Sequence, residues 1–420
     1  MTTLTPQTPQ NDPATPVAGI ERTDRRQLAV VCAASFVVWM GFGAILPYLP
    51  VFLREEAHAS MWLIGVVAAG YSVGTFLLAS PLGRLSDIIG RKPVIVFGVV
   101  VYAVSTFLFV VTTTAEWFIV FRFLEGVGAA AVTPAGQALL ADISPEKERS
   151  RAFGWLVSAQ FGGLVFGPAL AVPLFSIGEQ GGGLWGYHAI FLFGSFVSAL
   201  AAIALVFTLR EPEHVRRRRS EAIVRPPIRQ LLTPAIVAFI VLAFTTEFAF
   251  GTYEVVWSIY LRGLGAPMSY IGFTWVAFSV PMLFAFLGGR LADRYNRFLL
   301  MFSGYAISSL AWVYYGMTSN LTMFIIVNVI EGVAVAWSFP AKQAFLTQVS
   351  PPRWLGTVTG MENTSMQLAI LIGSLTAPLL YDAIGGLVIS ISGALSLIGI
   401  VATAPVLQRA WRAASATADA

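Results

Sequence analysis

The chain has 420 residues, of which 56% are hydrophobic and only 11% are charged, and its mean hydropathy is +0.74. These values are typical of a protein embedded in a bilayer and exclude an ordinary soluble globular domain. The formal net charge of +4 does not require a nucleic-acid partner, because basic residues of a membrane protein act as topology signals and contact anionic lipids.

Runs of about 20 mainly apolar residues predict membrane-spanning helices, because a helix of that length crosses the hydrocarbon core. Six runs lie in the first half of the chain, near residues 27–52, 62–82, 93–112, 117–141, 151–176 and 188–209. Six more lie in the second half, near residues 233–260, 269–289, 298–317, 320–346, 356–381 and 385–407. The predicted fold is an all-α integral membrane protein with twelve transmembrane helices.

Polar segments divide the chain into five parts. Residues 1–26 are polar and rich in Pro and Thr, and we expect a disordered leader there, because the next apolar run is too long for a signal peptide. Residues 210–231 form a basic linker between an N-terminal six-helix bundle, 27–209, and a C-terminal six-helix bundle, 232–407. Residues 408–420 form a polar tail.

The two halves are related in sequence. Residues 83–92 read GRLSDIIGRK, and residues 289–297 read GRLADRYNR, 206 positions later (289 − 83). The same offset joins Glu125, Gly126, Pro134, Gln137, Pro145 and Gly154 to Glu331, Gly332, Pro340, Gln343, Pro351 and Gly360. A repeat this long is not a solenoid unit, so the chain consists of two related halves.

Basic residues predict the orientation, because Lys and Arg near the ends of spans stay preferentially in the cytoplasm. One side of the predicted topology carries almost all of them, and the opposite side carries only Arg54 and Arg262. Both termini and the linker are therefore expected to be cytoplasmic, in the cell (inner) membrane. The single Cys32 excludes an intrachain disulfide.

These residues resemble the major facilitator superfamily of secondary transporters over essentially the whole chain after residue 26. The sequence Gly83-x-Leu85-x-Asp87-x-x-Gly90-Arg91-Lys92 resembles the signature loop of that family, and Arg122-x-x-Glu125-Gly126-x-Gly128-Ala129-Ala130 resembles its fourth-helix motif. Gly154, Gly163, Gly167 and Pro168 are similar to the fifth-helix motif of drug/proton antiporters. The chain departs from these motifs at Glu125, where the family has Gln, and at Ala171-Val172, where it has Gly-Gly.

The signature loop is a candidate conformational latch. Gly83 and Gly90 permit close approach, Asp87 can accept hydrogen bonds from a helix N-terminus or pair with an arginine, and Arg91 can reach an acid such as Asp142. A weaker copy consists of Gly289, Asp293 and Arg297. The resemblance implies that the latch closes the cytoplasmic side in the outward-open state. The alternative is a basic loop that only sets topology.

Charged residues deep in a span are costly and therefore informative. They occur in three predicted spans, as Arg122 with Glu125, Glu247 with Glu254, and Glu331 with Lys342; Glu362 is shallower. The resemblance implies that the first, fourth, seventh and tenth helices line the central cavity, so three cavity helices carry these charges. Glu247 has no basic neighbour on its own helix and is the first candidate for carrying protons; Glu331 is the second. The alternative is that the acids only pair with Arg122 and Lys342 to fix helix packing.

Aromatic side chains accompany the charges. Candidates for lining a substrate cavity are Trp39, Phe248, Tyr253, Trp257 and Trp337. Aromatic rings with carboxylates suit lipophilic, often cationic, molecules. The alternative is that the rings only pack against helices or face lipid. Gly163, Gly167 and Pro168 are expected to permit close helix packing and a kink.

The functional prediction is a secondary active transporter that works by alternating access, most simply proton-coupled efflux of small amphipathic molecules across the bilayer. Lipid or glycolipid flipping and nutrient uptake remain open as alternatives. No metal-binding or catalytic histidine motif and no Gly-x4-Gly-Lys-Ser/Thr loop occurs in the sequence, so we expect neither an enzyme nor an ATP-driven pump. No cofactor other than a proton gradient is expected, and the protein is expected to be monomeric.

Overall fold

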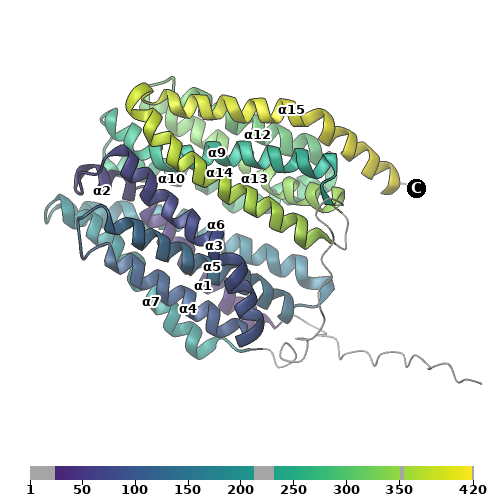
Figure 1. The fold of residues 1–420 in the computed structure, drawn as a ribbon, viewed down its shortest axis with the longest axis horizontal. Helices are drawn as coiled ribbons and strands as arrows, with labels where there is room; N and C mark the ends of the chain where they lie inside the picture. Colours follow the sequence, from purple (N-terminus) through teal and green to yellow (C-terminus); the bar gives the residue numbers. More distant parts are fainter. Residues whose placement is uncertain (1–23, 212–230, 351–353, 419–420) are drawn as a thin grey trace, which may run out of the picture.

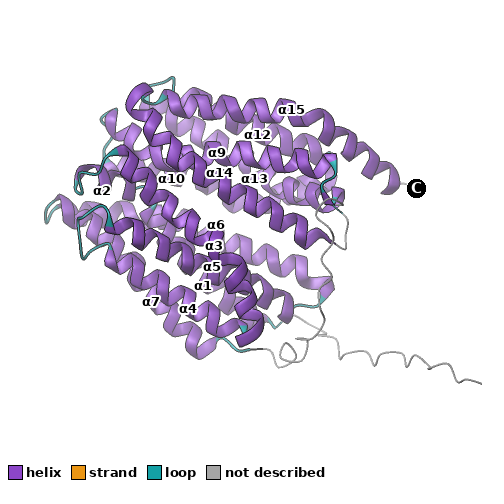
Figure 2. Cartoon of the chain, viewed as in Figure 1, coloured by secondary structure: helices purple, strands orange, loops and turns teal. Residues whose placement is uncertain are grey.

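The computed structural model describes residues 24–211, 231–350 and 354–418, and these ranges form helices joined by short loops, without strands (Figure 2). In the first half the helices are α1 (Arg25–Ile45), α2 (Leu49–Glu55), α3 (Met61–Ile89), α4 (Arg91–Leu108), α5 (Trp117–Ile143), α6 (Glu146–Glu179) and α7 (Gly183–Thr208). In the second half they are α9 (Pro234–Gly263), α10 (Met268–Ser279), the 3-10 helix η2 (Val280–Phe284), α11 (Ala285–Arg294), α12 (Arg297–Tyr315), α13 (Leu321–Val349), α14 (Leu355–Ile384) and α15 (Leu387–Ala418). The predicted leader up to residue 23, the linker between 212 and 230, and the last two residues of the tail lie outside the described residues.

The prediction of twelve membrane spans is confirmed, because twelve segments in the described ranges are long and apolar enough to cross a membrane. Two spans are interrupted, which hydropathy alone did not indicate. The first consists of α1 and α2, separated by a turn at 46–48 that contains Pro47. The eighth consists of α10, η2 and α11, and Pro281 lies in η2. Each interruption contains a proline, which cannot donate to the helical hydrogen-bond ladder and clashes with the preceding turn.

Polar caps fix where the first helix of each bundle begins. The Asp24 carboxylate accepts hydrogen bonds from the backbone N–H groups of Arg26 at 3.0 Å and Gln27 at 3.1 Å. The Thr233 hydroxyl accepts one from the N–H of Ile236 at 3.3 Å. These side chains satisfy N–H groups that have no carbonyl partner within the helix, so α1 and α9 both start at a defined residue.

Helices α1–α7 pack as one bundle and α9–α15 as a second beside it (Figure 1). Between the bundles, α3 packs against α14 and α6 packs against α10. The start of α1 and the end of α7 lie together, because the Gln27 amide donates to the Thr208 carbonyl at 3.2 Å. We call this the terminal end, since α15 also ends there, and the opposite end, which carries α2, the α2 end (Figure 1).

The two bundles are joined at the α2 end and separated at the terminal end. At the α2 end the Arg262 guanidinium of α9 donates to the Glu55 carboxylate of α2 at 2.6 Å. There too a side chain at Gly65 of α3 would lie 2.7 Å from the Ser374 carbonyl of α14. Four glycines toward the terminal end would meet no atom within 4 Å if they carried a Cβ: Gly136, Gly154, Gly289 and Gly360. The molecule therefore has open space on the side where its termini lie.

Glycines permit equivalent close helix contacts in the two bundles. At Gly167 of α6 a Cβ would collide with the Met40 carbonyl and lie 2.6 Å from the Ala44 N–H nitrogen of α1. At Gly373 of α14 a Cβ would collide with the Phe248 carbonyl of α9. The backbones touch at these positions, because glycine has no side chain to separate them. Gly167 and Gly373 are equivalent in the repeat, because they are 206 residues apart (373 − 167). The residues that they contact, Met40 and Phe248, are 208 residues apart (248 − 40), so α1 and α9 correspond at an offset two residues longer than the rest of the repeat.

A Gly167→Val substitution is expected to destabilise the N-terminal bundle by about 1 to 3 kcal/mol, because a well-packed contact would have to separate. Thermal unfolding of the purified protein, followed by tryptophan fluorescence, measures this loss. The matched control is Gly154→Val on the same helix, where an added side chain meets no atom within 4 Å. Equal unfolding temperatures for the two variants would contradict the close contact between α1 and α6.

Candidate functional site

A buried ion pair occupies the middle of the N-terminal bundle. Arg122 and Glu125 lie one turn apart on α5, and the guanidinium donates to the Glu125 carboxylate at 2.8 Å. The other oxygen of Glu125 accepts a hydrogen bond from the Thr106 hydroxyl of α4 at 2.8 Å. Arg122 is 3% exposed and Glu125 is fully buried, so the pair is held inside the protein by its own bundle.

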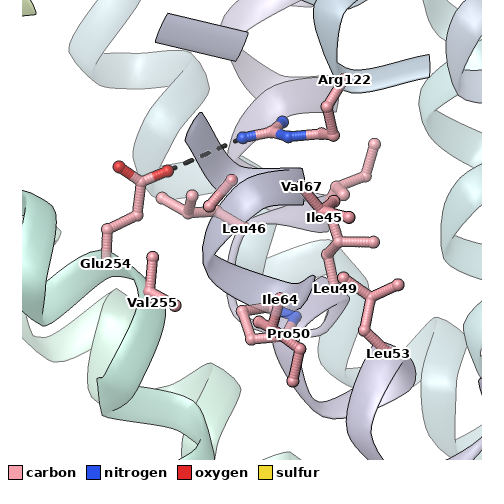
Figure 3. Close-up of a pocket in the computed structure, with 11 residues that line it drawn as sticks. Ile45, Leu46, Leu49, Pro50, Leu53, Ile64, Val67, Arg122, Glu254 and Val255 are labelled. Carbon is pink, nitrogen blue, oxygen red and sulfur yellow. Dashed lines mark ion pairs between the residues drawn. The ribbon is translucent and has the colours of Figure 1, made fainter. Parts of the chain in front are cut away.

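Arg122 also reaches the other bundle. Its guanidinium lies 3.8 Å from the Glu254 carboxylate of α9, and Figure 3 shows the two side chains facing each other above apolar residues of α1 and α2. The guanidinium stacks on the Tyr71 ring of α3, 4.9 Å from its centroid. One cation is thus shared between an acid of each bundle. The sequence predicted the pair within α5 but not this contact, because spacing along one helix says nothing about which helices meet.

A second cluster lies in the C-terminal bundle. The Lys342 ammonium of α13 forms an ion pair with the Glu362 carboxylate of α14 at 2.8 Å and lies 3.9 Å from the sulfur of Met366. Lys342 is 4% exposed and Glu362 is 1% exposed. Glu247 of α9 makes no direct ion pair with a described residue, but its charge interacts with Lys342 and Glu362. Glu362 was absent from the predicted set, although its charge within a span was a signal that could have placed it there.

Glu331 lies apart from both clusters. It is 2% exposed and accepts a hydrogen bond from the Tyr315 hydroxyl of α12 at 2.8 Å. No described basic side chain pairs with it. The repeat explains why: at an offset of 206, Arg122 corresponds to Asn328, whose amide donates to the Phe324 carbonyl at 2.7 Å. The C-terminal bundle therefore has an acid, Glu331, at the position equivalent to Glu125, but no cation at the position equivalent to Arg122.

These contacts give the membrane interior an excess of acidic groups. The described spans hold two buried cations, Arg122 and Lys342, and five carboxyl groups: Glu125 and Glu254 near Arg122, Glu362 and Glu247 near Lys342, and Glu331 apart from both. A bilayer interior does not accommodate a large net charge. The surplus carboxyl groups are therefore chemically suited to bind and release protons.

Two of the predicted cavity aromatics do not line a cavity in this conformation. Tyr253 is 4% exposed and Trp257 is fully buried, and their rings stack at 4.6 Å beside Trp275 and Tyr315. The Trp257 indole donates to the Thr274 hydroxyl at 3.0 Å. These rings instead form the core near the α2 end, because that end is closed. The sequence placed these aromatics on one predicted span but did not show what covers them.

The remaining predicted aromatics lie nearer the open space. Trp39 lines a pocket in the N-terminal bundle together with Phe42 and Tyr71. Phe248 and Trp337 are half-buried, and the described residues include no hydrogen-bond partner for the Trp337 indole N–H. The structure therefore brings together Trp39, Phe42, Tyr71 and Arg122 on one side of the molecule.

The signature loop forms an ion-pair cluster at the terminal end. The Arg91 guanidinium at the start of α4 pairs with Asp87 of α3 and lies 3.3 Å from Asp142 of α5. Gly90 joins α3 to α4 with a φ of 112°, in the region that favours glycine. Glu211, which sequence reasoning missed, accepts hydrogen bonds from the N–H groups of Arg91 and Lys92 at 2.8 and 2.9 Å and so caps α4.

The second copy of the loop differs from the first in the partner of its arginine. Arg297 donates to the Gln348 amide oxygen at 3.4 Å, and Gln348 corresponds to Asp142 at an offset of 206. The Arg91–Asp142 ion pair of the first copy therefore corresponds in the second to a hydrogen bond from the charged Arg297 to a neutral amide. Gly289 faces open space, and the side chain of Asp293 lies outside the described residues.

Comparisons with known proteins agree with this arrangement. The family model of the Major Facilitator Superfamily matches residues 31–284 and 239–417. The chain is 27% identical over 363 residues to Multidrug resistance protein 2 of Bacillus subtilis (strain 168), covering 83% of this chain and 86% of that protein. It is 23% identical to Quinolone resistance protein NorA of Staphylococcus aureus (strain MRSA252), covering 90% and 95%. The crystal structure of a D-xylose-proton symporter has the same fold, with a TM-score of 0.73 at 15% identity over 90% of this chain and 97% of that one.

Proposed function

Because the chain belongs to the Major Facilitator Superfamily, whose members are membrane transporters of small molecules and not enzymes, we propose that it exports small amphipathic, drug-like molecules in exchange for protons. The observation that carries the proposal is the surplus of buried carboxyl groups around a single arginine and a single lysine on opposite bundles. The names of the multidrug and quinolone resistance relatives support the substrate class.

The separation of the bundles supports a direction. We place the terminal end in the cytoplasm of a cell-membrane protein, because the basic residues gather on that side. The structure is then open to the cytoplasm and closed outside by the contact of Glu55 with Arg262. An exporter takes up its substrate from this state and binds protons from the outward-open state.

Proton exchange follows from competition for the same charges. Arg122 lies near both Glu125 and Glu254, and Lys342 pairs with Glu362 while its charge also acts on Glu247. Each cation can neutralise one acid fully, so the other acid is the one that a proton neutralises. When the bundles move relative to one another, Arg122 keeps Glu125 and Tyr71 of its own bundle and loses Glu254 of α9, so the distribution of charge changes with conformation. Proton binding and bundle movement are thereby linked.

Inside-out vesicles with an acidic interior test the proposal. Separate additions of lipophilic cations, neutral drugs, sugars and lipids are made while a fluorescent dye reports interior pH. We expect drug-like compounds to collapse the pH gradient and sugars to leave it intact. Vesicles from cells with an empty vector are the control. A collapse produced only by sugars or lipids, or by no compound class, would overturn proton-coupled drug export.

A further inference from the structure

A small cavity lies between the two bundles, beside the contact of Arg122 with Glu254. It has about 20 Å³ of space for water, and a single water molecule requires about 10 to 15 Å³. Arg122 lines it from α5 and Glu254 from α9, and most of the remaining wall comes from α1, α2 and α3. Figure 3 shows the two charged side chains facing each other, with the apolar wall below them. The cavity therefore has the size of one water molecule.

The polar groups that line the cavity include a donor and an acceptor without partners. The Arg122 Nε–H is buried and has no acceptor among the described residues. Glu254 Oε1 is 3.8 Å from the Arg122 guanidinium, which is too far for a hydrogen bond, and its carboxylate accepts none from another described residue. The Glu125 carboxylate, by contrast, accepts directly from Arg122 at 2.8 Å. The two unpartnered groups therefore meet at one cavity without bonding each other.

One water molecule would satisfy both groups at once. Its oxygen accepts a hydrogen bond from the guanidinium, and one of its hydrogens is donated to the carboxylate. A water bridge is the usual arrangement when two polar groups face each other at a distance slightly too long for a direct hydrogen bond. The carboxylate would repel an anion in this position and the guanidinium would repel a cation. The charges and the volume therefore select a neutral molecule of the size of water.

The rest of the wall is apolar and separates the cavity from the α2 end. The other nine lining residues are all apolar, and they include Leu46, Leu49 and Leu53 around the break between α1 and α2. These three residues are at most 6% exposed. Glu55, at the end of α2, pairs with Arg262 of α9 and holds the two helices together there. The cavity is therefore closed toward the α2 end, and separation of α2 from α9 would open it on that side.

We propose that this cavity binds one water molecule that bridges Arg122 and Glu254, and that Glu254 exchanges its proton through this water. The water site rests on the geometry alone, whereas its role in proton exchange deepens the proposed efflux function and rests on it. Of the described groups, Arg122 and Tyr71 are those whose charge acts on Glu254. Because Arg122 and Glu254 belong to different bundles, the bridge exists while the α2 end is closed. When that end opens, a proton from outside passes from water to a carboxylate oxygen of Glu254.

Infrared difference spectra between acidic and alkaline buffer test the water site on the purified full-length protein, without any substrate. Spectra recorded in ordinary water and in oxygen-18 water isolate the O–H bands of bound water whose hydrogen bonds change when a neighbouring acid titrates. We expect an isotope-sensitive band in the wild type. The band should be lost in Glu254→Gln, because the titrating group next to the water is absent.

Two valines of α9 provide matched variants. Val255 lines the cavity and is 1% exposed, whereas Val256 is fully buried and lies outside it. Val255→Ile adds one methylene group, close to the volume of a water molecule, and should remove the band. It should also slow the proton exchange driven by tetraphenylphosphonium, a lipophilic cation, in inside-out vesicles roughly tenfold, the value of one hydrogen bond to a charged group. Val256→Ile should change neither, and Val255→Ala, which enlarges the cavity, should keep the band.

Two results would overturn the water site: no isotope-sensitive band in the wild type, or a band that persists in Glu254→Gln or in Val255→Ile. Loss of the band in Val255→Ile with an unchanged rate of proton exchange would overturn the role of the water in exchange. Proton exchange in the wild type without the band would reject the water and keep the efflux function. The expected band without proton exchange driven by any compound would keep the water and reject coupled efflux.

Discussion

A Glu247→Gln variant is expected to fold normally and to lose the dependence of transport on the pH gradient. Glu247 is the acid of the C-terminal cluster that has no direct ion pair, since Lys342 is already bonded to Glu362 at 2.8 Å. Removing its proton-binding group therefore removes exchange without leaving a buried cation alone. One proton moved down a gradient of one pH unit releases about 1.4 kcal/mol, which sustains roughly a tenfold substrate gradient. The variant should fail to build this gradient in inside-out vesicles.

A substitution of Glu362, the acid that pairs with Lys342, is expected to have a different effect from Glu247→Gln. Glu362→Gln leaves the Lys342 ammonium without its bonded carboxylate, and breaking a buried pair in this way costs about 3 to 5 kcal/mol. We therefore expect a lower unfolding temperature for Glu362→Gln and an unchanged one for Glu247→Gln. The double variant Lys342→Met/Glu362→Gln should recover stability, because no buried ammonium is left without its carboxylate. If Glu247→Gln still concentrated substrate with the wild-type response to pH, the assignment of proton exchange to this cluster would be wrong.

The fold could be predicted from the sequence because bilayer physics leaves few choices. An apolar run of sufficient length must be a spanning helix, since backbone groups in lipid have to be satisfied within the segment. The repeat at 206 residues then required two similar bundles. What hydropathy could not show was the break at Pro47 and at Pro281, because these residues lie within apolar sequence and change geometry rather than composition.

The sequence identified most of the charged residues of the candidate site but not which of them pair. Intramembrane charges stand out because they are costly, which identified Arg122, Glu247 and Lys342. Their partners come from other helices, however, and depend on how those helices are rotated. The sequence placed Glu331 and Lys342 on the same predicted span, whereas in the structure Glu331 accepts a hydrogen bond from Tyr315 and Lys342 pairs with Glu362. The sequence pattern is one-dimensional, and only packing decides which side chain a long lysine reaches.

An Asp87→Asn variant is expected to insert and fold but to transport poorly, because it weakens the closed form of the terminal end. Asp87 is 61% exposed on the end of α3, in the structure whose terminal end is open. Across the interface α3 packs against α14, which begins at Leu355 on the same side. On closure the carboxylate can meet the positive N-terminus of α14, a contact worth about 1 to 2 kcal/mol, or a factor of about 5 to 30 in population. Asparagine offers no charge for this contact.

Chemical labelling of the single cysteine, Cys32, can measure how far the terminal end is open. Cys32 lines a groove between α1 and α6 at the terminal end and lies two turns before Trp39 on the same face of α1. A maleimide added to inside-out vesicles should label Cys32 faster in Asp87→Asn than in the wild type, since the variant spends more time open at this end. Asp382→Asn, an exposed acid at the other end of α14, is the matched control and should change neither labelling nor transport. Asp87→Glu should restore much of the rate, because the charge returns. Transport by Asp87→Asn at the wild-type rate would show that the loop sets topology and does not act as a latch.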